Sequence, residues 1–115
     1  MTPLWQLSAV EQSAGVKNRT FTATELVHSA LGRVEQENAQ LNAIVDLLDE
    51  SALTAAQAAD AAVADGKTLG PLHGVPVTVK VNVDTKGRAT TNGMGIFEDT
   101  IAPDHSPVVS NLLKA

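Results

Sequence analysis

Valine occupies every odd position of the stretch Val75-Pro76-Val77-Thr78-Val79-Lys80-Val81-Asn82-Val83. This period of two, carried by β-branched residues, predicts a β-strand. In such a strand the valines face one side of a sheet, and Thr78, Lys80 and Asn82 face the other. The pattern therefore places a lysine on the polar face of a half-buried strand.

Two glycine-bearing segments flank this stretch. The chain enters it through the tight turn Gly70-Pro71-Leu72-His73-Gly74 and leaves it through an irregular loop over residues 86–93. A lysine on the polar face of a strand is ordinarily just solvated. However, a strand held between two such loops is also a common way to present a functional side chain on a rigid element. The spacing alone leaves both interpretations open.

Two helix starts precede this stretch. Ser8 and Glu11 form a capping-box pattern that predicts a short helix to about Ala14. Thr22 and Glu25 form a second capping box, flanked by Phe21 and Leu26 at the positions of a hydrophobic staple, which predicts a helix to about residue 37.

The remaining elements follow from alternation, caps and breakers. Residues 41–47 alternate like a strand, and Asp49 or Ser51 is expected to cap a helix over residues 52–64 that ends at Asp65-Gly66. Ser106-Pro107 is expected to start the last helix, which would run to the C-terminal residue without a cap. Helices alternating with strands predict an α/β fold, with the helices and strands in separate layers.

Composition excludes several classes of function. A net charge of −5 and a pI of about 4.9 disfavour nucleic acids and anionic membranes as partners. The chain has no cysteine, and its histidines lie without partners at ligand spacing, so no metal site is expected. No cofactor is expected either. The sequence contains neither a signal-peptide pattern nor a membrane-length apolar run, which predicts a cytoplasmic protein.

The block from Gly70 to Lys80, followed by Asn82, Asp84, Gly87 and Thr90-Thr91, resembles the amidase signature family. Weaker resemblance extends over residues 21–42, 102–109 and 111–115. This family hydrolyses C–N amide bonds with a serine–serine–lysine triad, and the resemblance maps its catalytic lysine onto Lys80. It also implies a large mixed sheet flanked by helices, of which residues 1–115 would be the N-terminal part of a single larger amidase domain.

The chain departs from the family pattern in two ways. Val81 stands where the family usually has an acidic residue, but residue 81 of a strand points away from the Lys80 face. In addition, the family's serines lie in a glycine- and serine-rich stretch, and this chain has no such stretch. We therefore expect residues 1–115 to hold only the lysine of the triad and to be inactive alone.

The loop after the lysine is the expected substrate contact. Thr91, Asn92, Gly93 and Met94 are candidate substrate-binding residues, although their turn-forming composition also suits a simple change of chain direction. The resemblance implies a small-molecule amide as the substrate, and the expected partner is a second copy of the chain or the remainder of the amidase. Two alternatives remain open: the glutaminase subunit of a transamidase, and a truncated, catalytically silent assembly module.

Overall fold

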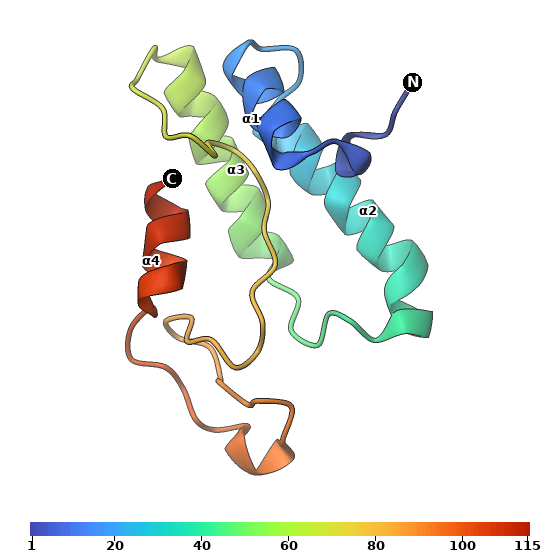
Figure 1. Ribbon diagram of the computed structural model, residues 1–115, viewed down its shortest axis with the longest axis vertical. Coiled ribbons are helices and arrows are strands. Elements are labelled where there is room, and N and C mark those ends of the chain that lie inside the picture. Colours follow the sequence, from blue (N-terminus) through green and yellow to red (C-terminus); the bar gives the residue numbers. More distant parts are fainter. The chain divides into compact units, whose positions relative to one another are not determined.

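The computed structural model describes residues 1–115, which divide into two compact units, Met1–Pro76 and Val77–Ala115. The first unit contains a 3₁₀ turn, Leu4–Gln6, and the helices α1 (Ala9–Lys17), α2 (Ala23–Leu41) and α3 (Asp49–Ala64). The second contains a 3₁₀ turn, Gly95–Phe97, and the helix α4 (Pro107–Lys114). Figure 1 accordingly draws coiled ribbons joined by irregular segments, with no arrow for a strand. None of these helices is both long enough and apolar enough to cross a membrane.

Both predicted capping boxes are confirmed. The Ser8 and Thr22 hydroxyls accept hydrogen bonds from the backbone amides of Glu11 and Glu25, while the two glutamates accept from the cap amides in return. These paired bonds satisfy amide groups that would otherwise lack intrahelical partners. Both helices extend further than expected, since α1 ends at Lys17 and α2 at Leu41.

The last two helices match the prediction in part. Ser106 caps α4, with Pro107 in its first turn, and α3 ends where Gly66 has a positive φ of 66°, as expected. The expected cap of α3 is wrong. That helix begins at Asp49, its N-cap is Leu48 without a side-chain cap, and the Ser51 hydroxyl donates to the Leu48 carbonyl.

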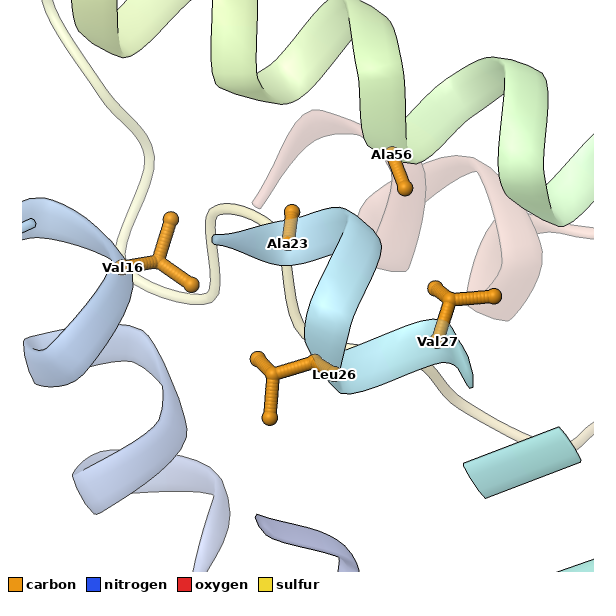
Figure 2. Close-up of a cluster of buried hydrophobic side chains, with 5 residues drawn as sticks. All are labelled: Val16, Ala23, Leu26, Val27 and Ala56. Atoms are coloured by element: carbon orange, nitrogen blue, oxygen red, sulfur yellow. The ribbon is translucent and has the colours of Figure 1, made fainter. Parts of the chain in front are cut away.

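The core of the first unit lies where α2 meets α1 and α3. Figure 2 shows its five buried side chains: Val16, Ala23, Leu26, Val27 and Ala56. Helices α2 and α3 run antiparallel beside each other (Figure 1), and the small Ala23 and Ala56 let their backbones approach closely. Phe21 packs against this cluster, which contains its predicted staple partner Leu26. Burying a leucine fully, as here, stabilises a fold by about 2 kcal/mol.

The predicted β-sheet is wrong. The chain is helical, and its only strand-like pairing is an isolated antiparallel bridge between Ala89 and Ile101. Residues 41–47 show one physical reason. Asn42 takes a left-handed conformation (φ 48°) at the end of α2, and the Asn38 side chain then bonds both backbone groups of Ile44, at 2.8 and 2.9 Å. A side-chain amide thus takes the place of a neighbouring strand.

The alternating stretch 75–83 forms no strand either. A strand is stabilised by hydrogen bonds to a neighbour, and here turns occupy both ends of the stretch. The Val75 amide donates to the Leu72 carbonyl at 3.1 Å, and the Val83 amide donates to the Lys80 carbonyl at 2.9 Å. Val77 and Val79 are 54% and 38% exposed, whereas Val75, Val81 and Val83 are half-buried, so the predicted apolar face is covered only in part.

Candidate functional site

The turn that precedes the lysine stretch is docked onto the helices of the first unit. The Ser13 hydroxyl and the Lys17 amine both donate to the Pro71 carbonyl, at 2.7 and 3.3 Å. The ring nitrogen Nε2 of His73 lies 2.9 Å from the Ala59 carbonyl, which can only accept, so Nε2 carries a proton. Helices α1 and α3 therefore both hold this turn.

Gly74 closes the turn against two helices and has no room for a side chain. Its φ of 79° is unfavourable for other residues, and a Cβ there would lie 2.9 Å from the Cβ of Ala23 and 3.0 Å from Cγ1 of Val16. Glycine is therefore required here for both conformation and space.

Lys80, the candidate catalytic base, lies in the second unit with an exposed side chain. Thr78 and Asn82, its predicted companions on the polar face, are exposed as well. The Lys80 carbonyl accepts from the Val83 amide, so the lysine begins a tight turn instead of sitting within a strand.

The four candidate substrate residues form a tight turn of their own. The Met94 amide donates to the Thr91 carbonyl at 2.9 Å, and the two central residues, Asn92 and Gly93, have positive φ angles of 51° and 75°. Positive φ at both central positions is the signature of a type I′ turn, which favours Asn-Gly. The Thr91 side chain is half-buried, whereas the Met94 side chain is 45% exposed.

The fold of the second unit brings this turn to the lysine segment. The Asn92 amide donates to the carbonyl of Val81, the residue after Lys80, at 3.4 Å. Behind the turn, residues 87–90 pair with residues 100–102 around the Ala89–Ile101 bridge. The backbone next to the predicted lysine and the predicted substrate turn are therefore close in space, although 11 positions separate Lys80 from Thr91 in the sequence.

Asp84 connects the parts of this unit and was not among the predicted site residues. Its carboxylate accepts a hydrogen bond from the Thr90 hydroxyl at 2.6 Å, and its carbonyl accepts from the amide of Ser106, the N-cap of α4, at 3.0 Å. Two residues further on, the Lys86 amide donates to Nδ1 of His105 at 3.1 Å. The sequence signals for this residue were its place in the block that resembles the amidase signature family and its position two residues after Asn82.

Several serines are committed to local structure. Ser8 and Ser106 cap helices, Ser13 and Ser51 donate to carbonyls, and the Ser29 hydroxyl accepts from the Trp5 amide. The second unit exposes the Lys80 side chain, and the residue after it, Val81, contacts the Thr91–Met94 turn through the Asn92 amide. An exposed amine can act as a base when neutral, or bind a carbonyl or an anion when charged.

An open pocket of about 540 Å³ lies in the first unit, and it contains none of the predicted site residues. It is lined by residues of α2, the loop that follows α2, and the start of α3: His28, Leu31, Gly32, Val34, Glu35, Asn38, Ala39, Leu47 and Asp49. No three His, Asp or Glu side chains of residues 1–115 are grouped to hold a metal ion.

Comparison with known proteins identifies the family. The family model described as Amidase matches residues 25–115. The chain is 48% identical over 113 residues to the indoleacetamide hydrolase of Bradyrhizobium diazoefficiens, covering 98% of this chain and 22% of that protein. It is 35% identical over 112 residues to a glutamyl-tRNA(Gln) amidotransferase subunit of Natranaerobius thermophilus, covering 97% of this chain and 23% of that protein. It thus spans less than a quarter of the length of these relatives.

Solved structures that match this chain also include an amidase. A bacterial aryl acylamidase of the amidase signature family matches 88% of this chain and 21% of its own with a TM-score of 0.82 and 28% identity. A second match is described as a vestigial protein complex that reveals the origins of an s-triazine catabolic enzyme. It covers 92% of this chain and 23% of its own, with a TM-score of 0.87 and 27% identity. The chain therefore belongs to the amidase signature family.

Proposed function

We propose that residues 1–115 are the lysine-bearing part of an amide hydrolase, a single larger amidase domain that cleaves C–N bonds through a Ser-Ser-Lys triad. Lys80 is the base of the triad, and both serines come from residues outside this chain. The observation that carries the proposal is the family match over residues 25–115, which includes the Gly70–Lys80 block. The complete polypeptide that contains residues 1–115 is called the parent amidase below.

The proposed chemistry follows from the weakness of amides as electrophiles. The attacking serine must lose its proton as it attacks, and a neutral lysine can receive that proton through a bridging serine. Burial favours the neutral form of an amine. Because Lys80 is exposed in this chain, the parent amidase must supply the covering residues, and its relatives are more than four times as long as this chain.

The substrate is proposed to be a small-molecule amide that contacts the Thr91–Met94 turn. The proximity of Asn92 to Val81 supports this, since it brings the turn to the residue that follows the base. The exposed Met94 side chain is the apolar group of the turn that is available to a substrate. The remainder of the amidase, or a second copy of the chain, is the proposed partner of residues 1–115.

A second candidate is the glutaminase subunit of a transamidase. The 35% identity to the glutamyl-tRNA(Gln) amidotransferase subunit of Natranaerobius thermophilus favours it. The two candidates share the base and differ in the amide that is cleaved. Turnover of glutamine against turnover of an aryl or alkyl amide separates them.

The test is the exchange of Lys80 in the parent amidase. Lys80→Ala should lower the turnover of a simple aryl amide by ~10²–10⁴-fold, the usual contribution of a general base. Lys80→Arg should be equally poor, because arginine keeps the charge but does not give up its proton. Lys86→Ala is the matched control. It removes an exposed lysine of the same unit whose amine lies 3.8 Å from Asp104, and it should leave turnover unchanged. Turnover of Lys80→Ala within a few-fold of the unmodified enzyme would refute the proposal.

A further inference from the structure

Two hydrogen bonds bracket the Thr91–Met94 turn. On one side the Thr90 hydroxyl donates to the Asp84 carboxylate at 2.6 Å, and on the other the Asn92 amide donates to the Val81 carbonyl at 3.4 Å. The first is short and has a charged acceptor, whereas the second is at the long limit for a hydrogen bond. The Asp84–Thr90 bond is therefore the stronger of these two restraints on the turn.

Asp84 is itself held from two directions. The tight turn that begins at Lys80 ends at Val83, directly before Asp84, and the Asp84 carbonyl accepts from the amide that starts α4. The backbone of Asp84 is thus held at the end of the lysine turn. Thr90 adds a backbone bond to the Thr100 carbonyl at 2.9 Å, which limits its movement.

We propose that Asp84 and Thr90 are positioning residues that hold the Thr91–Met94 turn beside Lys80 and thereby set the enzyme's choice between small and bulky amides. This inference rests on the proposed function of Lys80. Neither side chain takes part in bond cleavage. The Asp84–Thr90 hydrogen bond affects the substrate only indirectly, because it holds in place the turn that the substrate would contact.

The first experiment compares substrate selectivity in the parent amidase. The ratio of kcat/KM for a bulky aryl amide to kcat/KM for a small alkyl amide is measured for Thr90→Val, which keeps the shape of the side chain and removes the donor. We expect this ratio to change about tenfold, the scale associated with losing a hydrogen bond to a charged group. Thr90→Ser keeps the hydroxyl and should restore the original ratio. Asp84 is exposed and stays hydrated without its partner, so Thr90→Val should still fold.

Controls separate positioning from a general loss of stability. A purely structural role would reduce kcat/KM for both amides by the same factor and leave their ratio unchanged. Asp104→Ala removes an exposed ion pair of the same unit and should leave the ratio unchanged. Adding Asp84→Ala to Thr90→Val should produce no further change, because both substitutions remove the same bond.

A second readout does not depend on catalysis. Amide hydrogen exchange at Asn92 should speed up in Thr90→Val and return to the original rate in Thr90→Ser, since the hydroxyl restrains the turn. An unchanged ratio and unchanged exchange in Thr90→Val would overturn the inference, as would a Thr90→Ser variant that behaves like Thr90→Val.

The Lys80 and Thr90 variants together separate the failure of this inference from the failure of the proposed function. If Lys80→Ala remains active, the proposed function fails. If Lys80→Ala is inactive while Thr90→Val is normal, the inference alone fails.

Discussion

The carboxylate of Asp60, on α3, accepts a 2.6 Å hydrogen bond from the hydroxyl of Thr24, in the first turn of α2. It also accepts from the backbone amides of Ala23 at 2.7 Å and of Thr24 at 3.1 Å. Thr22 and Glu25 satisfy each other's amides in the capping box. The backbone amides at the start of α2, which have no partner within the helix, are therefore all hydrogen-bonded to side chains. Half of these bonds go to Asp60, which lies more than 30 positions away in the sequence.

Replacing this carboxylate should destabilise the first unit. Asp60→Ala leaves the fully buried Ala23 amide without its partner, so we expect a loss of about 2 kcal/mol in the free energy of unfolding. Asp60→Asn keeps one acceptor oxygen and should lose less. Urea unfolding followed by the helical circular dichroism signal measures both. Asp65→Ala, which removes an exposed 3.8 Å ion pair with Lys67, is the control and should change stability by less than ~0.5 kcal/mol.

Two helical glycines should respond in opposite directions to alanine. A Cβ at Gly15 in α1 would overlap the Phe21 ring, so Gly15→Ala should overpack the core at a cost of about 1–3 kcal/mol, less the gain in helix propensity. A Cβ at Gly32 in α2 meets nothing within 4 Å, so Gly32→Ala should stabilise the fold by about 0.5–1 kcal/mol. The same urea titration compares them. A stabilising Gly15→Ala would show that the Phe21 ring moves aside freely.

The capping box of α1 should depend on acid. The side-chain hydrogen bond from Ser8, followed by the bond from the Ser8 amide, holds the pKa of Glu11 below its ordinary value of 4.5, and burial opposes this only weakly. Because the folded-state pKa is the lower one, this contribution to stability is complete above pH 4.5 and is lost as the pH falls through the folded-state pKa. Glu11→Gln should therefore destabilise the chain at neutral pH, and the difference from the unmodified chain should shrink in stronger acid. An NMR titration of Glu11 with a midpoint at or above 4.5 would contradict this account.

Met94 should affect selectivity more than stability. Its side chain is 45% exposed, so Met94→Ala should change the stability of the parent amidase by less than ~0.5 kcal/mol. The ratio of kcat/KM for bulky and small amides should nevertheless change. Ile96→Ala, which truncates an 85% exposed side chain in the following 3₁₀ turn, is the control for general loop effects. A large drop in melting temperature with unchanged kinetics would mean that Met94 serves only the turn.

Residues 1–115 alone should show no amidase activity and should associate in solution. Both triad serines are proposed to lie outside this chain. The second unit also exposes large apolar side chains, including Val77 (54%), Ile96 (85%), Ile101 (55%), Val108 (59%) and Leu113 (68%). Exposed apolar side chains on this scale favour association with a partner. Light scattering and an aryl amide assay test the isolated chain, and a cooperative monomer that hydrolyses amides would contradict the proposed function.

The sequence by itself determined where α1, α2 and α4 begin and which family the chain belongs to. Capping boxes at Ser8 and Thr22, and the Ser106-Pro107 start of α4, depend on residues a few positions apart, so their physics is local. The Gly70–Lys80 block is likewise a continuous motif, and the family match confirms the resemblance drawn from it.

Only the tertiary structure decided the rest, because it depends on which polar groups the folded chain brings together. Alternation in residues 75–83 describes one face of a strand but cannot supply the neighbour that a ladder requires, and the described chain contains none. The Asp60 cap on α2, the Asn38 amide on Ile44 and the Asp84–Thr90 bond likewise join polar groups across turns or between helices. A polar side chain can form hydrogen bonds with many different groups, and the sequence does not say which of them will lie within reach in the folded chain.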